Sequence, residues 1–484
     1  MLTRRQLLLS AAALGGAGAL GARVPAPSHA EALARRLEPK SGKIVSVDFN
    51  IAERQIAMPA FGGKSLPLWT FQDGSDFPVV RLQLGDALKA RIKNALTRPG
   101  EHVTIHWHGL RIPNGQDGVA YMTQPPIQPG TEGLYEFAPP DTGTYFFHTH
   151  CNSVEHFGRG LIGALIVEGD EVEKADQDLV LMMKDWRIAP DGAFLPFSTH
   201  DGAAKAGTSG TVRSINGVTK PVIKVKASAD VRMRLLNVDS SRISEIGMEG
   251  ANAAIIAIDG NACVPIPFES WRFGPATRLD ILMRSPKPGE TARLLDYFSA
   301  QPIVLAEFTG EGEAVREGNF KSHALRDGRF APVDVKSAER LTFDLSTTAT
   351  GESIAALGDA AGLEIGSLCL SKRSFWAINK QSWASADHRD AGPPLATLKA
   401  GNSYIFALKN LTAHAHPIHI HGHTFEVLSS SSRKLPRHRA DTVLVLPRET
   451  IEVALKADNP GKWMFHCHIL EHQETGMMGY IAVV

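Results

Sequence analysis

A cysteine stands between two histidines near the C-terminal end of the chain, in the sequence HCHILEHQETGM. Positions i and i+2 of a β-strand point to the same face, so we expect His466 and His468 on one face and Cys467 on the other. A thiolate, an imidazole such as that of His472 and a thioether such as that of Met477 are ligands for copper and related metals. The stretch therefore predicts two metal sites, one on each side of a single strand.

Paired histidines recur along the chain. Its 19 histidines include six His-x-His pairs, where chance placement would give about one. Four pairs can each aim two imidazoles at one point, because the strand period brings positions i and i+2 to one face. These four pairs lie at 106/108, 148/150, 419/421 and 466/468. Their eight imidazoles are too many for one metal ion and fit three ions with two or three nitrogens each.

The other predicted site has the ligands of an electron-transfer copper. His416 precedes the pair at 419/421, and Cys467, His472 and Met477 follow the spacing Cys-x₄-His-x₄-Met. Two histidines, one cysteine and a weak axial methionine are typical of a blue-copper centre. Because Cys467 is joined directly to a histidine on each side, the strand predicts a covalent path for electrons between the two sites.

Three segments with one pattern predict three related β domains. Residues 77–96, 220–238 and 393–411 each contain an alternating strand, a turn, a second alternating strand and an asparagine. Similar units at wide spacing indicate copies of one structural element. We therefore expect an all-β fold with three domains in a chain of 484 residues.

The histidine pairs belong only to the outer two copies. TGTYFFHTH at 142–150 matches PGKWMFHCH at 460–468, and HWHG at 106–109 matches HIHG at 419–422. The middle copy contains one histidine, His200, and no pair. We therefore predict that the middle domain holds no metal.

Composition and turn-rich stretches predict the boundaries of the three β domains. The domains are predicted at 40–170, 171–315 and 335–484.

Residues 1–30 combine a twin arginine, a short Leu/Ala/Gly run and a small-x-small end. This pattern predicts a signal for the twin-arginine export machinery and a periplasmic protein. A membrane anchor is the alternative, but the apolar run is short for a span.

Charge and hydropathy argue against two classes of partner. The formal net charge is zero, which gives no indication of nucleic-acid binding. No later apolar run is long enough to insert the mature chain in a membrane.

If Cys467 binds a metal, Cys151, Cys263 and Cys369 remain. At most one intramolecular disulfide can then form, and the sequence leaves its pairing open.

From about residue 45 to its end, the chain resembles the bacterial three-domain multicopper oxidases of the laccase type. The resemblance depends on four motifs together: HWHG, HTH, HPIHIHG and HCHILEHQETGM. It implies three cupredoxin-like domains of the Greek-key β-sandwich or barrel type and four copper ions per chain, with the outer domains sharing a trinuclear cluster. The implied ligands are His416, Cys467, His472 and Met477 for the type 1 ion, His106 and His419 for the type 2 ion, His108, His148 and His468 for one type 3 ion, and His150, His421 and His466 for the other.

The resemblance also implies a reaction. A small reducing substrate gives single electrons to the type 1 copper at the exposed edge of His472, and Cys467 passes them to the trinuclear cluster, where O₂ becomes two waters. Phenols or aromatic amines are the expected substrates. The alternatives are a metal oxidase acting on Cu(I), Mn(II) or Fe(II), a copper-free envelope scaffold, and a two-domain nitrite reductase. The absence of methionine between Met283 and Met464 argues against Cu(I).

Proton delivery to O₂ requires carboxylates. Asp117 holds the position of an acid near the type 2 copper in relatives, and its alternative role is that of an ordinary turn residue. The chain departs from some bacterial relatives at Gln473, where a glutamate donor is common. Glu471 and Glu474 are possible substitutes. Histidines outside the motifs, including His388, are predicted to be structural.

Overall fold

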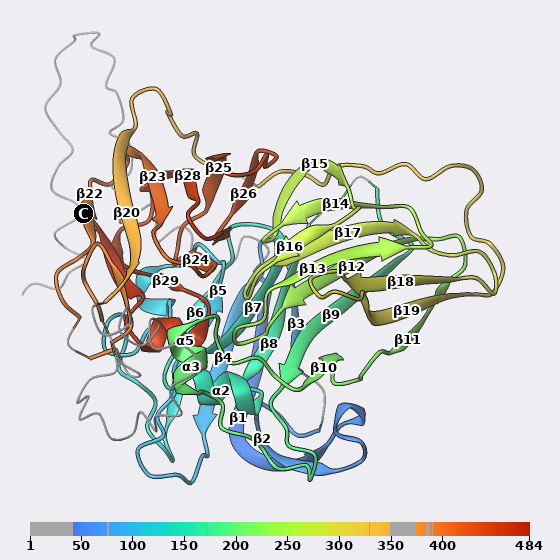
Figure 1. Ribbon diagram of the computed structural model, residues 1–484, viewed down its shortest axis with the longest axis horizontal. Coiled ribbons are helices and arrows are strands. Elements are labelled where there is room, and N and C mark those ends of the chain that lie inside the picture. The colour runs from blue at the N-terminus through green and yellow to red at the C-terminus, as the bar shows by residue number, and fades with distance from the viewer. Residues whose placement is uncertain are drawn as a thin grey trace, which may run out of the picture. The chain divides into compact units, whose positions relative to one another are not determined.

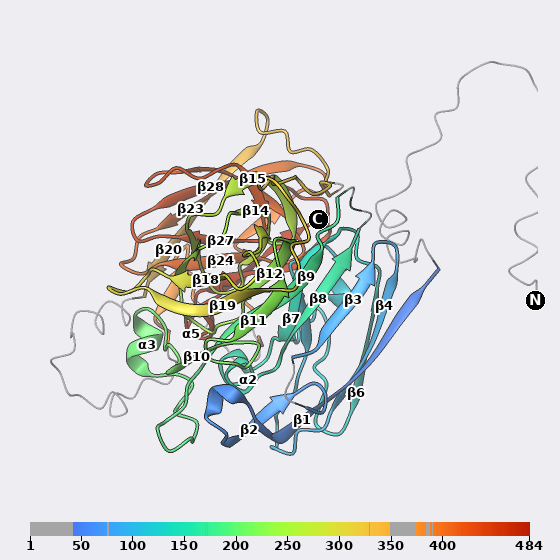
Figure 2. The ribbon, with the colours of Figure 1, turned by 90° about the vertical axis from the view of Figure 1, so that its right-hand side faces the viewer.

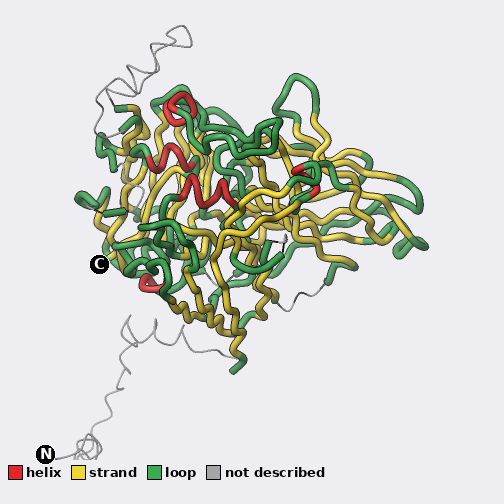
Figure 3. Tube along the Cα trace, turned by 90° about the horizontal axis from the view of Figure 1, so that it is seen from below, coloured by secondary structure: helices red, strands yellow, loops and turns green. Residues whose placement is uncertain are grey.

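The computed structural model describes residues 42–74, 77–169, 171, 173–328, 330–348, 374–383, 388–389 and 391–484. The predicted export signal at 1–30 and Cys369 lie outside the described residues. Among the described residues, no helix is long and apolar enough to cross a membrane. Strands dominate this part of the chain, as the yellow trace in Figure 3 shows, and the all-β prediction is confirmed.

The first pair of sheets is built from residues 44–168. One sheet has the order β2-β1-β4-β6 and consists of Ser65–Thr70, Ile44–Ala57, Ala87–Asn94 and Glu132–Phe137. The other has the order β3-β8-β7-β5 and consists of Val79–Gln83, Ile162–Glu168, Gly143–Thr149 and Ile105–His108. Figure 2 shows β7, β8 and β3 side by side, next to β4 and β1. Phe49, Trp107 and Phe147 lie in the core between the sheets.

The second pair is built from residues 177–311. The order β10-β9-β12-β17-β14-β15 joins Val212–Ile215, Gln177–Trp186, Asp230–Asn237, Arg278–Arg284, Ala253–Ile258 and Asn261–Pro267. The order β11-β19-β18-β13-β16 joins Val222–Lys226, Ile303–Glu311, Thr291–Asp296, Ser244–Glu249 and Trp271–Phe273. In Figure 1 these strands are coloured green to yellow.

The third pair is built from residues 339–483. The order β21-β20-β23-β28-β25-β26 joins Trp376–Ile378, Glu339–Thr347, Ser403–Asn410, Thr450–Lys456, Phe425–Ser430 and His438–Ala440. The order β22-β30-β29-β24-β27 joins Ala396–Leu398, Met478–Val483, Gly461–Cys467, His416–Ile420 and Thr442–Val445. Short helices connect strands at Pro59–Phe61 (η1), Asn114–Gln116 (η2), Ser153–Arg159 (α2), His200–Ala204 (α3) and Leu470–Glu474 (α5).

The asparagine near the end of each of the three similar segments has a structural role. Asn94, Asn237 and Asn410 are buried at the ends of β4, β12 and β23. Each side-chain amide donates to at least two backbone carbonyls, and each Oδ1 accepts the backbone N–H two residues later. Buried backbone groups require such partners, so the asparagine closes the strand end in all three places.

Candidate metal centre

The strand period separates the paired histidines from the hydrophobic core. On β5, Ile105 and Trp107 lie in the core of the first pair of sheets, so His106 and His108 point away from it. Antiparallel pairing then places His106 opposite His148.

The third pair of sheets repeats this arrangement. Ile418 and Ile420 lie in its core, His419 lies between them on β24, and His421 directly follows the strand. Pairing of β24 with β29 places His419 opposite His466. His106 and His108 thus share one face of β5, as predicted. In the other three pairs the second histidine, His150, His421 or His468, directly follows the strand that carries the first.

The four pairs converge. Among the described residues, three groups of histidines each bring ring nitrogens within 4.8 Å of one another, and every member is buried. The groups are His106, His108 and His419; His108, His148 and His468; and His150, His421 and His466. Each group combines residues from the first and the third pairs of sheets, so neither pair forms this centre alone.

These imidazoles fit copper. The Nδ1–H groups of His106, His148 and His419 donate to the carbonyls of Asp117, Thr149 and Asp441 over 2.8, 2.9 and 2.9 Å. The Nε2 atoms of the same three rings are buried and have no hydrogen-bond partner in the described part of the chain. A ring with one nitrogen held by an acceptor and the other buried and unsatisfied is typical of a metal ligand.

Burial also favours the neutral, metal-binding form of the rings. It is the largest cause that lowers the pKa well below the ordinary histidine value, and neighbouring imidazoles lower it further. This holds for His108, His148, His150, His416, His421, His466 and His468. Protons therefore do not compete with a metal at neutral pH.

Cys467 lies on the opposite face of β29. Its Sγ is 3.7 Å from Nδ1 of both His416 and His472, and these two nitrogens are 3.1 Å apart. Burial raises the pKa of the thiol, so a thiolate here requires a bound cation. Met477 is buried in the same core cluster, and its carbonyl accepts the Cys467 N–H over 3.0 Å. The predicted type 1 residues are thus brought together.

The expected exposed edge of His472 is not found. The ring is fully buried, and its Nε2 lies 2.9 Å from the carbonyl oxygen of Lys205, which follows α3. The same segment is also held by Trp376, whose Nε1 donates to the carbonyl of Ala203 in α3 over 2.6 Å. Figure 1 shows α3 next to α5, the helix that carries His472. A segment from the middle part of the chain, remote in sequence, therefore covers this residue.

Asp117 lies among the histidine groups. Its Oδ2 accepts from His421 Nδ1 over 2.9 Å, its Oδ1 is 3.3 Å from His106 Nδ1, and its side chain is buried. The turn after it requires glycine, because a Cβ on Gly118 at φ +81° would come within 1.8 Å of the Ile105 carbonyl oxygen. The Asp-Gly pair is therefore both a turn and a way to point a carboxylate at the centre.

Two buried residues at the centre belong to no motif that could be recognised in the sequence. Asp441 Oδ1 is 3.0 Å from His108 Nε2, and its carbonyl holds His419. His388, predicted to be structural, places Nε2 2.7 Å from His150 Nδ1. Asp441 is a single acid after a strand and His388 is a lone histidine, so only long-range packing brings them to the metal residues.

The two possible substitutes for a glutamate at Gln473 have different surroundings. The carboxylate of Glu471 accepts from Thr208 Oγ1 over 2.7 Å, so it faces the segment around α3. Glu474 is partly buried and accepts the N–H of Val154 over 3.0 Å, in the helix that follows His150. Burial raises the pKa of Glu474 to about 7. Of the two acids, only Glu474 contacts the segment that follows a histidine pair.

Comparison with known proteins gives one consistent family. Three family models described as multicopper oxidase match residues 54–172, 177–291 and 371–484. Multicopper oxidase MmcO of Mycobacterium tuberculosis is 24% identical, over 98% of this chain and 95% of that protein. The crystal structure of a multicopper oxidase from Pseudomonas thermotolerans is 34% identical with a TM-score of 0.79, and the match covers 91% of this chain and all of that one.

A further solved relative, a multicopper oxidase of Campylobacter jejuni described as a metallo-oxidase, is 26% identical with a TM-score of 0.75. The match covers 91% of each chain. The paired sheets, the buried histidine groups and the matches over nearly all of the described residues lead to one conclusion. The chain belongs to the multicopper oxidase family and is a copper-binding oxidoreductase.

Proposed function

We propose that the protein takes single electrons from a small reducing substrate and reduces O₂ to two waters, using four copper ions per chain. His416, Cys467, His472 and Met477 would hold one ion, and the eight histidines of the three groups would hold the others. Copper supplies the one-electron chemistry. The observation that carries the proposal is that Cys467, the last residue of β29, lies with His416 and His472, whereas its two neighbours in the chain lie in the histidine groups.

We propose phenols or aromatic amines as the substrates. Relatives include Laccase-1 of Botryotinia fuckeliana, 25% identical over 86% of this chain. The covered ring of His472 also supports a second candidate, oxidation of a metal ion, because a small reductant needs less space at a buried site. Iron transport multicopper oxidase FET3 of Gibberella zeae is 24% identical over 83% of this chain.

The twin-arginine motif supports export to the periplasm as a further proposal.

Copper loading and oxygen uptake test these proposals. The copper-loaded protein should be blue and hold about four copper ions per chain. Oxygen consumption is then compared with a dimethoxyphenol and with Fe(II), Mn(II) and Cu(I) as the reductant. Turnover of the phenol supports the first candidate, and turnover of metal ions alone supports the second. A colourless protein without bound copper would refute both.

Asp117→Asn should slow oxygen reduction without changing the blue colour. Asparagine keeps the size of the side chain but cannot take up and release a proton at this position beside the His421 and His106 rings. The expected decrease in kcat is about a hundredfold, measured by oxygen uptake with copper content held equal. Asp73→Asn, on a carboxylate that is 93% exposed, is the control. Equal rates for the two variants would remove Asp117 from proton delivery.

Replacing residues 200–205 by glycine and serine at the same length should loosen the segment that covers His472. The expected result is a rise in kcat/KM for the dimethoxyphenol of about tenfold, with the visible spectrum retained. The control is Asp201→Asn, which changes an exposed side chain of α3 and leaves the backbone cover in place. If the linker variant and the control oxidise the phenol equally, α3 does not limit access.

A further inference from the structure

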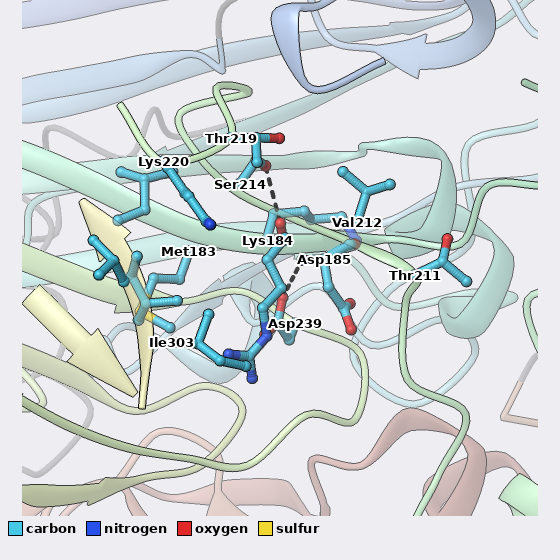
Figure 4. Close-up of a pocket in the computed structure, with 14 residues that line it drawn as sticks. Met183, Lys184, Asp185, Thr211, Val212, Ser214, Thr219, Lys220, Asp239 and Ile303 are labelled. Atoms are coloured by element: carbon cyan, nitrogen blue, oxygen red, sulfur yellow. Dashed lines mark hydrogen bonds between the residues drawn. The ribbon is translucent and has the colours of Figure 1, made fainter. Parts of the chain in front are cut away.

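The cavity in the middle pair of sheets contains no residue of the metal centre (Figure 4). Polar groups of its wall bond to one another: Ser214 Oγ donates to the Lys184 carbonyl over 2.9 Å, and Lys184 Nζ donates to the Asp185 carbonyl over 2.9 Å. His388 makes a different kind of contact. It lies between β21 and β22 of the third pair of sheets and reaches a histidine of the first pair.

The ring of His150 is held by an imidazole from another pair of sheets. Three other rings of the centre donate their Nδ1–H groups to backbone carbonyls, whereas His150 Nδ1 lies 2.7 Å from Nε2 of His388. His150 Nε2 is buried and has no hydrogen-bond partner among the described residues. The ring therefore presents Nε2 to a metal while His388 contacts its other nitrogen.

The position of the proton on His388 decides what this contact can be. Its Nε2 also lies 2.5 Å from the carbonyl oxygen of His150, and one nitrogen cannot donate to that carbonyl and accept from the His150 ring. If Nε2 of His388 carried the proton, it would face a lone pair on His150 Nδ1. His150 would then carry its own proton on Nε2, where a metal binds. A His150 ring that binds metal through Nε2 therefore requires the tautomer of His388 that accepts at Nε2.

Neighbouring side chains hold His388 at this position. Trp383 Nε1 donates to the carbonyl of Arg389 over 3.1 Å, and the ring centres of Trp383 and His388 lie 5.8 Å apart. Arg389 Nη2 donates to Tyr121 Oη over 2.8 Å, in the connection that precedes β6 of the first pair of sheets. Tyr121 and His388 both have a φ of +62°, which residues other than glycine rarely adopt, so the surrounding structure must hold both of them.

We propose that His388 is a positioning residue of the metal centre, which accepts the Nδ1–H of His150 and so leaves Nε2 of that ring for copper. Arg389 places it there by binding Tyr121 on the first pair of sheets. The inference rests on the proposed function, because it assigns His150 to a bound ion. Its effect is confined to the histidine groups, since His150 belongs to one of them and not to the group of Cys467.

Competition between the full chain and a chelator for copper tests this proposal. Metal analysis counts the bound ions, and the blue colour reports the Cys467 site. His388→Leu removes the acceptor and should weaken copper binding by the histidine groups at least about tenfold, with the colour kept. His388→Gln offers an amide oxygen near the position of Nε2 and should restore most of the affinity. His388→Asn is shorter and should not restore it.

Unfolding of the copper-free protein separates positioning from a purely structural role. His388→Leu and His388→Gln should unfold at similar denaturant concentrations and differ in copper affinity. Tyr121→Phe removes the hydroxyl that Arg389 binds, so it should weaken copper binding by less than His388→Leu does. His323→Leu is the matched control, since His323 pairs with Glu173 outside the metal groups, and it should bind copper like the parent chain.

The proposal is overturned if His388→Leu holds copper like the parent chain, or if His388→Gln binds copper no better than His388→Leu. It is also overturned if the blue colour is lost together with the copper of the histidine groups, or if the affinities of the variants follow their copper-free stabilities. If His388→Leu does not fold, the comparison of His388→Gln with His388→Asn decides the question. A parent chain without bound copper would refute the proposed function and this inference with it, whereas full copper content in both the parent chain and His388→Leu would refute the inference alone.

Discussion

Cys467→Ser abolishes the blue colour of the copper-loaded protein and lowers oxygen consumption by about a thousandfold or more. A serine hydroxyl remains protonated at neutral pH and is a poor ligand where a thiolate is required. Cys467 is also the residue that connects His416 and His472 with the histidines on either side of it. Its loss therefore removes both a ligand and the covalent path between the two sites.

Two measurements identify the cause of this loss. The visible spectrum reports the cysteine site, and the copper content reports whether the histidine groups still bind about three ions. Cys263→Ser is the matched control, because Cys263 is a half-buried thiol on β15, outside the metal-site groups. The control should keep its blue colour and its rate of oxygen consumption. A Cys467→Ser protein that stays blue or consumes oxygen normally would show that electrons do not pass through Cys467.

Arg278→Met lowers the free energy of unfolding by about 3–5 kcal/mol and weakens copper binding by the histidine groups. Arg278 is fully buried on β17 in the middle pair of sheets. Its Nη1 donates to Asp441 Oδ1 over 2.8 Å in the third pair, and its Nε donates to the Thr144 carbonyl over 3.2 Å in the first pair. Its Nη1 also donates to the Ala276 carbonyl over 3.0 Å in the middle pair, so one guanidinium bonds to all three parts of the chain.

The effect on copper comes through Asp441, which orients His108 and His419. Burial by itself would raise the pKa of Asp441, but Arg278 outweighs it and holds the pKa below the ordinary aspartate value. A depressed pKa stabilises the folded protein above the unfolded pKa of about 4, and this stability is lost as the pH falls below it. Without Arg278, the carboxylate is buried and unpaired, so it takes up a proton or moves away from the two rings.

Denaturant unfolding of the copper-free protein and the copper content after loading measure these two effects separately. Arg293→Met removes an exposed pair and should change the free energy of unfolding by less than about 1 kcal/mol. Full stability and full copper content in Arg278→Met would show that the middle pair of sheets does not support the metal centre.

The sequence alone was sufficient for the local geometry of the centre. The i, i+2 spacing of His106 and His108, with Trp107 between them, is enough to place two imidazoles on one face and an indole in the core. The same period predicts the two-sided role of Cys467. These inferences succeed because strand alternation is a property of neighbouring residues and does not depend on the rest of the fold.

The tertiary structure decided which groups surround those residues. The cover over His472, the carboxylate of Asp441 beside His108, and His388 beside His150 all come from segments far away in the chain. The prediction of an exposed His472 was wrong because exposure depends on what packs against a side chain, and here the segment around α3 supplies the cover. Local spacing determines where an imidazole points, whereas burial and hydrogen-bond partners are set by long-range packing, which no short motif encodes.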